Sequence, residues 1–335
     1  MHRARRPARS ISTSPFANIR DAAPKAQFPE EQSADGSFAR QQDAFDRWIR
    51  ADGSGDFPVE AGRYHLYVSY ACPWAHRTIA VRALKGLEAA VSMSAVDPVR
   101  DERGWRFGEG AGFSPDRVNG FAFLSEAYNA ADPQYSGRIT VPVLWDRRSK
   151  TIVSNNDDHI MRMFETQFDA LAKHPERDLY PAAHADEIER LNAWLYETFN
   201  NGVYKAGFAT SQRSYEHAAC DVFATLDALE ERLAQRRYLI AEQQTETDWR
   251  AFVTLIRFDA VYVGHFKCNL RRIVDYPNLW GYLRDLYQTP GIAQTVNFDH
   301  IKRHYYSTHD DINPTRIVPI GPLLDLTAPH GRDKL

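Results

Sequence analysis

Residues 64–77 read Tyr-His-Leu-Tyr-Val-Ser-Tyr-Ala-Cys-Pro-Trp-Ala-His-Arg, and this stretch decides the fold. Residues 64–70 are rich in aromatic and β-branched side chains, with apolar and polar positions roughly alternating, which predicts a short strand. From Trp74 onward the apolar residues follow helical spacing, through Thr78 and Val81. Proline suits the first turn of a helix, because its missing N–H would be unpaired there. The pattern therefore places Cys72 where a strand ends and a helix begins.

This position favours a reactive thiol at Cys72. Free N–H groups and the dipole at a helix N-terminus stabilise an anion, and can lower a thiol pKa from about 8.5 into the range of roughly 3.5–7.5. The fourth residue of the motif is Ala75 rather than a second cysteine. An internal disulfide therefore cannot form within the motif, and an outside thiol must resolve any mixed disulfide at Cys72. The alternative is a buried cysteine that only fills space.

Composition favours a globular protein of one or two domains. The chain has 335 residues, 43% hydrophobic and 25% charged, with a net charge of −3. This charge gives no argument for a nucleic acid or membrane partner. The cysteines are few and odd in number (Cys72, Cys220, Cys268), which favours a reducing compartment and a cytoplasmic location. No Cys/His spacing suggests a zinc site, and no apolar run approaches the ~20 residues that span a bilayer.

The chain divides into four predicted regions. Residues 1–60 are expected to be a partly flexible extension with a basic, acid-poor start, for which a transit peptide is the alternative. A short helix within residues 38–49 is expected to dock on the body. Residues 61–170 predict an α/β domain with strands near 64–70, 90–96, 141–145 and 151–153 and mixed strand directions. Residues 181–315 predict an all-helical domain, and residues 316–335 an irregular tail.

Two features of the α/β region indicate a ligand site. Pro142 interrupts a strand-like run, which suggests a cis-proline turn that leaves the backbone of Val141 free to pair with a peptide-like ligand; an ordinary edge-strand proline is the alternative. About 40 residues between Pro98 and Arg138 exceed what a minimal domain needs, and their aromatic side chains predict an ordered loop. Trp105 in this loop is either a ligand contact or a packing residue.

The helical region supplies candidate acids. Thr245 and Asp248 fit a capping box that begins a strongly apolar helix. Tyr204 lies in a predicted polar bend, Tyr262 on the apolar helix, and Tyr305 near the end of the region. A phenol can donate a proton or hydrogen-bond a thiolate. For each tyrosine, packing with a satisfied hydroxyl is the alternative.

These motifs carry a family resemblance that covers about residues 36–315. The chain resembles the glutathionyl-hydroquinone reductases, also called xi-class glutathione transferases, in six segments: residues 63–77, 97–105, 138–145, 200–212, 257–269 and 300–306. The resemblance implies the glutathione-transferase fold, an α/β thioredoxin-like N-terminal domain followed by an all-α C-terminal domain. It also implies a homodimer.

The resemblance further implies a reaction and its residues. Cys72 would attack the sulfur of a glutathionyl-hydroquinone, Tyr204 would protonate the departing aryl carbon, and Tyr262 and Tyr305 would hydrogen-bond the thiolate. A second glutathione would regenerate Cys72, and no metal is implied. The implied glutathione-binding residues are Trp105, Arg138, Ile139, Thr140, Val141, Pro142, Asn156 and Asp157.

One segment departs from the family pattern. Where the family has Asn-Glu-Ser, which holds the γ-glutamyl amine and carboxylate, this chain has Asn155-Asn156-Asp157. Asp157 places a negative charge where a ligand carboxylate would lie, and Asn156 removes the charge that would pair with the amine. The co-substrate is therefore glutathione or another low-molecular-weight thiol, such as mycothiol or γ-glutamylcysteine.

Two other functions stay open. A cysteine-type transferase could act as a general thiol reductase on dehydroascorbate or on protein mixed disulfides. The fold also serves non-catalytic binding modules, since fold does not fix function. The presence of Cys72 together with Tyr204, Tyr262 and Tyr305 favours an enzyme over a scaffold.

Overall fold

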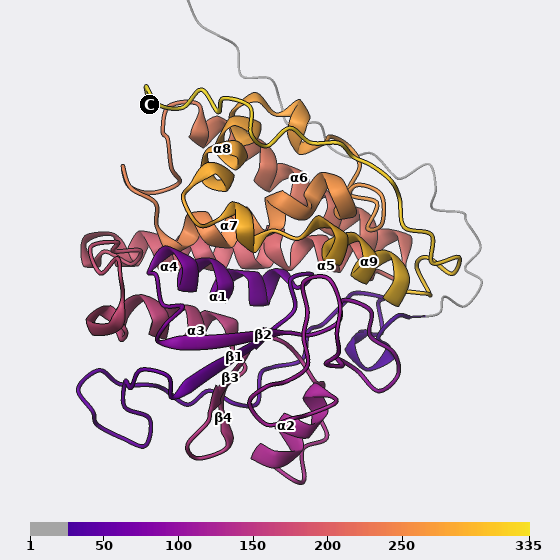
Figure 1. Cartoon of the computed structure of the whole chain (residues 1–335). Helices are drawn as coiled ribbons and strands as arrows, with labels where there is room; N and C mark the ends of the chain where they lie inside the picture. Colours follow the sequence, from indigo (N-terminus) through magenta and orange to yellow (C-terminus); the bar gives the residue numbers. More distant parts are fainter. Residues whose placement is uncertain (1–25) are drawn as a thin grey trace, which may run out of the picture.

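A four-stranded sheet forms the N-terminal part of the computed structural model, which describes residues 26–335 (Figure 1). Its strands are β1 (Tyr64–Val68), β2 (Val91–Ala95), β3 (Val143–Asp146) and β4 (Thr151–Ser154). The strand order is β2-β1-β3-β4, with β1 parallel to β2 and antiparallel to β3, and β3 antiparallel to β4. The predicted mixed sheet is confirmed.

Helices cover both faces of this sheet. Helices α1 (Pro73–Leu84) and α3 (Asp157–Thr166) pack against each other on the face that meets the helical region, whereas α2 (Leu124–Ala131) packs beside β4 on the opposite side (Figure 1). Cys72 is the N-cap of α1 and Pro73 its first residue, as the sequence predicts. The strand-to-helix junction therefore lies at the border between the two regions.

The C-terminal region is built from helices. They are α4 (Ala185–Leu195), α5 (Gly202–Gly207), α6 (Gln212–Leu233), α7 (Glu246–Arg257), α8 (Pro277–Gln288) and α9 (Phe298–Thr308). Two π-helical turns, η4 (Tyr196–Asn200) and η5 (Phe258–Tyr262), follow α4 and α7. Short 3₁₀ turns are η1 (Pro29–Glu31), η2 (Asp169–Leu171), η3 (Ala182–His184), η6 (Ile273–Asp275) and η7 (Ala293–Thr295).

Helix α7 is the centre of the helical region. Every one of its residues is buried, and it packs against α1 of the neighbouring region. The predicted capping box is present, because the backbone N–H of Thr245 donates to Asp248 Oδ2 at 2.8 Å. The cap fixes where this helix begins, and its other end reaches the turn that carries Cys72.

The prediction of a helix within residues 38–49 is wrong. This segment runs in extended form beside β4: Phe45 accepts a hydrogen bond from the backbone N–H of Asn155, and Arg47 donates to the carbonyl of Val153, each at 3.0 Å. The free edge of β4 offers backbone partners that a helix could not use, so the segment adopts the strand-like conformation. The predicted docking itself is correct, since Phe38 and Ile49 are buried.

Three smaller outcomes complete the comparison with the sequence. Tyr204 lies within the short helix α5 rather than in a bend, which corrects that prediction. The Val141–Pro142 peptide bond is cis, as expected. The predicted basic, flexible start of the chain lies outside the described residues. Within residues 26–335, no helix is long and apolar enough to cross a membrane.

Candidate active site

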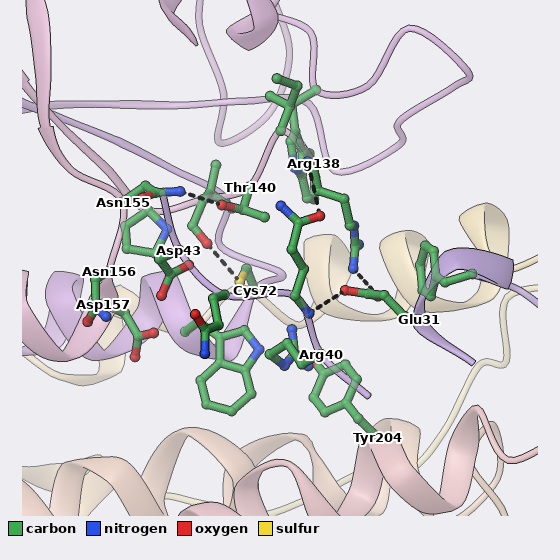
Figure 2. A pocket seen from close by; sticks show the side chains of 18 of the residues that line it. Glu31, Arg40, Asp43, Cys72, Arg138, Thr140, Asn155, Asn156, Asp157 and Tyr204 are labelled. Carbon is green, nitrogen blue, oxygen red and sulfur yellow. Dashed lines mark hydrogen bonds and ion pairs between the residues drawn. The ribbon is translucent and has the colours of Figure 1, made fainter. Parts of the chain in front are cut away.

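Cys72 lies on the floor of a cavity of about 440 Å³ between the two regions. The turn after β1 is closed by the backbone N–H of Cys72, which donates to the carbonyl of Ser69 at 3.1 Å. Figure 2 shows the thiol directed at the loop before cis-Pro142, where it donates to the carbonyl of Val141 at 3.5 Å. The nucleophile candidate is therefore fixed by two backbone segments.

The pKa of the Cys72 thiol is raised from its ordinary value, opposite to the direction expected from the helix N-terminus. Burial is the largest cause, because surrounding protein removes water that would solvate a thiolate. The backbone N–H groups of Ala75 and Trp74 and the Arg257 guanidinium act in the other direction and lower the pKa. The helix N-terminus thus contributes in the predicted direction, but desolvation by burial outweighs it.

The three predicted tyrosines lie together. The hydroxyl of Tyr305 lies 2.5 Å from that of Tyr204 and 3.1 Å from that of Tyr262. Burial raises the pKa of all three phenols, so each stays protonated at neutral pH. Tyr204 and Tyr305 line the cavity with Cys72, whereas Tyr262 lies behind them. Among the hydrogen bonds of residues 26–335, none joins Tyr262 or Tyr305 to the Cys72 sulfur; the Tyr305 hydroxyl bonds those of Tyr204 and Tyr262 instead.

The predicted thiol-binding residues share this cavity. They lie around Cys72, from the loop before α2, the cis-proline loop and the start of α3: Trp105, Arg138, Ile139, Thr140, Val141, Pro142, Asn156 and Asp157. Trp105 is almost fully buried and stacks on His304, with 4.9 Å between ring centroids. Trp105 therefore packs within the protein and also borders the cavity, and its contact with a ligand stays a prediction.

Charges differ between the two ends of the cavity. At one end, Arg138 forms an ion pair with Glu31 and lies over the ring of Phe28 (Figure 2). Arg100 lies between Phe28 and Trp105, and burial together with the charge of Arg138 lowers its pKa to about 10. This end is suited to an anionic group of a ligand.

The other end, at the start of α3, is rich in hydrogen-bond acceptors. Asn156 caps the helix by accepting from the backbone N–H of His159 at 3.0 Å. Asp157 forms an ion pair with the buried Arg77 at 2.9 Å. Burial and the neighbouring Asp158 raise the pKa of Asp157 to about 6, although Arg77 opposes them. The charge that the sequence places here is thus already partly neutralised by the protein.

Sequence reasoning missed the residues that the N-terminal segment contributes. Arg40 lies over the rings of Trp74 and Tyr204, at 4.8 and 4.9 Å from their centroids, and donates to Asn201 Oδ1. Asp43 faces the start of α3, and its pKa is raised to about 7, chiefly by burial and then by Asp157 (Figure 2). These residues lie far from Cys72 in sequence, so no local spacing could have indicated them.

Family models match both regions of the chain. The glutathione S-transferase N-terminal domain matches residues 71–167, and the glutathione S-transferase C-terminal domain matches residues 212–285. These matches cover the Cys72 turn, the cis-proline loop and helix α7. The predicted fold class is therefore confirmed.

Comparison with individual proteins gives a more specific assignment than the two family models. The chain is 54% identical to the glutathionyl-hydroquinone reductase YqjG of Escherichia coli, over 91% of this chain and 94% of that protein. The glutathione-bound structure of YqjG superposes with a TM-score of 0.84, over 87% of this chain and 96% of that one. Identity to the glutathionyl-hydroquinone reductase PcpF of Sphingobium chlorophenolicum is 48%, over 88% of this chain and 92% of that protein.

A structure of a Xi class transferase agrees with this assignment. The enzyme from Natrialba magadii superposes with a TM-score of 0.85 and 52% identity, over 87% of this chain and 89% of that one. Similarity at this level extends over most of the chain. The chain therefore belongs to the glutathione S-transferase family and, within it, to the glutathionyl-hydroquinone reductases of the Xi class.

Proposed function

We propose that this protein removes glutathione, or a related low-molecular-weight thiol, from glutathionyl-hydroquinones through a mixed disulfide at Cys72. The observation that carries the proposal is that a single-cysteine nucleophile and a protonated phenol, Tyr204, line one cavity. Cleavage of an aryl thioether needs both groups, because a thiolate must attack sulfur and the departing carbon must receive a proton. The names of YqjG and PcpF agree with this reaction.

The proposed first step uses Cys72 and Tyr204. The Cys72 thiolate attacks the thioether sulfur, the aryl carbon–sulfur bond breaks, and the aryl carbon takes the Tyr204 proton. The products are a free hydroquinone and a disulfide between Cys72 and the thiol. The electron pair of the broken carbon–sulfur bond stays on the aryl carbon, which is reduced, while the two sulfur atoms are oxidised to the disulfide.

In the proposed second step, an outside thiol attacks the mixed disulfide. It releases the Cys72 thiolate and leaves as a symmetrical disulfide, while its proton returns to Tyr204. Because Ala75 replaces a second cysteine, no internal thiol competes for this step.

Intact-mass spectrometry tests the proposal. The protein is incubated with conjugates of one hydroquinone to glutathione, mycothiol and γ-glutamylcysteine and, in separate reactions, with mixed disulfides of the same thiols, without added free thiol. We expect one thiol adduct per chain and one equivalent of released hydroquinone. Adducts formed only from mixed disulfides would favour the general thiol reductase, and no adduct from any donor would favour a binding module.

The start of α3 sets the choice of thiol, and we expect Asn156→Glu with Asp157→Ser to tighten glutathione binding by about tenfold. The glutamate would pair with the γ-glutamyl amine, and replacing Asp157 would remove a negative charge from the place of the ligand carboxylate; a gain of about 1.4 kcal/mol corresponds to a tenfold change. Titration calorimetry with glutathione measures the change. Asn269→Glu, on the surface away from the cavity, controls for a new glutamate that is remote from the ligand. Unchanged or weaker binding in the double variant would contradict this role.

Assembly and location complete the proposal. We expect a homodimer, which is supported by large exposed apolar side chains on the C-terminal segment, at Ile317, Ile320 and Leu323. Sedimentation analysis measures the oligomeric state. We also expect a cytoplasmic location, consistent with three unpaired cysteines in the described residues.

A further inference from the structure

We propose that Arg257, at the end of α7, is a positioning residue that holds the Cys72 turn and supplies the positive charge opposite the thiolate. The inference rests on the proposed use of Cys72 as a thiolate. It adds a role to a side chain of the helical region that does not line the cavity.

The contacts of Arg257 are directed at the turn that carries Cys72. Its Nε donates to the carbonyl of Ala71 and its Nη2 to the carbonyl of Tyr70, each at 2.9 Å. These are the two residues immediately before Cys72. Its Nη1 donates to the carbonyl of Val253 in α7 at 2.7 Å, which ties the guanidinium to its own helix. The planar fork therefore clamps the turn against α7, which a point charge could not do.

The charge of Arg257 has no carboxylate partner among residues 26–335. Its side chain is 0% exposed. The described ion pairs of buried arginines in this part of the molecule belong to Arg77 and Arg250 and do not include Arg257. Arg77 and Arg250, for comparison, pair with acids of α3 and α7. A buried cation without a counter-ion is costly. The charge of Arg257 lowers the pKa of the Cys72 thiol and also of the phenols of Tyr204, Tyr262 and Tyr305. Of these groups, Cys72 is the one whose turn Arg257 holds by hydrogen bonds.

His76 orients the guanidinium and adds no charge. Burial, and then the charge of Arg257, lower the pKa of His76 well below its ordinary value, so its ring is neutral. Its Nδ1 lies 3.0 Å from Arg257 Nη1 and must accept, because a guanidinium can only donate. Its Nε2 therefore carries the proton and donates to Thr295 Oγ1 at 2.8 Å.

Several other groups around Cys72 influence the thiol, and one of them, Arg100, is also a cation. Helix α1 contributes the backbone N–H groups of Trp74 and Ala75. The side chains that influence the thiol are Asp157 of α3, Tyr204 of α5 and Arg100 of the loop before α2. Asp157 opposes a thiolate and is held by Arg77. Arg257 is thus the cation that is fixed by hydrogen bonds to the cysteine turn itself.

The test is the pH dependence of Cys72 alkylation, which needs no substrate and so stands apart from the proposed reaction. The full chain and the variants Arg257→Gln and Arg257→Lys are treated with iodoacetamide between pH 6 and 11.5, and labelling at Cys72 is followed by peptide mass spectrometry. In Arg257→Gln we expect the midpoint to rise by about one pH unit, so labelling at pH 7 falls about tenfold. The control Arg271→Gln removes an exposed arginine and should keep the native midpoint.

The two variants separate charge from geometry. Arg257→Lys keeps the charge but loses the fork, so its midpoint should lie within about half a unit of the native one, with a severalfold lower plateau rate at high pH. A native midpoint in a folded Arg257→Gln protein overturns the proposal. If Arg257→Gln does not fold, Arg257→Lys decides. A native plateau rate of Cys72 alkylation in that variant, or an alkylation midpoint raised by a full pH unit, also overturns the proposal.

Discussion

Replacing Cys72 with serine is expected to reduce release of hydroquinone from the conjugate by about 10⁴–10⁶-fold, the size of effect seen when an enzyme loses its nucleophile. Serine keeps the shape of the side chain and the helix N-cap, but its hydroxyl stays protonated and cannot form the mixed disulfide. Single-turnover release of hydroquinone, followed by absorbance, measures the loss.

The other cysteines provide matched controls for this result. Cys268 is buried, and burial raises the pKa of its thiol to about 12; Cys220 lies part-buried on α6. Neither lines the cavity. Cys220→Ser and Cys268→Ser should therefore keep native rates. Turnover that survives in Cys72→Ser but is lost in either control would move the nucleophile elsewhere and refute the proposed reaction.

Replacing Tyr204 with phenylalanine is expected to slow cleavage of the aryl thioether by about 10²–10⁴-fold, the usual contribution of a general acid. Resolution of the Cys72 mixed disulfide should change little, because a sulfur leaving group needs no proton from Tyr204. The variant also leaves the Tyr305 hydroxyl without one of its two phenol partners. Rates of both half-reactions, measured by rapid quench and mass spectrometry, separate the two effects.

Tyr215→Phe is the matched control for Tyr204→Phe. The Tyr215 hydroxyl donates to the carbonyl of Lys267 near the surface, away from the cavity, so its loss should leave both half-reactions unchanged. If Tyr204→Phe slows both half-reactions equally, Tyr204 organises the site rather than donating a proton. If it slows neither, the proton comes from another group.

The sequence predicts those parts of the site that depend on local pattern. The order of strand, Cys72, Pro73 and helix follows from residue types over a dozen positions, and the structure confirms it. The same holds for the Thr245 cap and the cis bond before Pro142. In each case a local sequence pattern indicates the backbone conformation that the structure has.

What the sequence cannot predict depends on contacts between distant segments. Residues 38–49 contain apolar residues compatible with a helix, yet the open edge of β4 draws them into an extended conformation. Arg40 lies over the ring of Tyr204, although more than half of the described sequence separates the two residues. The direction of the Cys72 pKa shift likewise depends on how much protein surrounds the thiol, which no local motif records.

The extended segment beside β4 has a consequence for the behaviour of the whole molecule. An uncovered outer strand presents a row of free backbone groups to which another chain can add, which promotes aggregation. Phe45 and Arg47 occupy these groups on β4, while Arg40 and Asp43 of the same segment reach the cavity. A chain shortened to begin at β1 would therefore expose the edge of β4 and be prone to aggregate, and it would also lose part of the cavity lining. The solubility and the catalytic activity of the protein thus depend on the same segment.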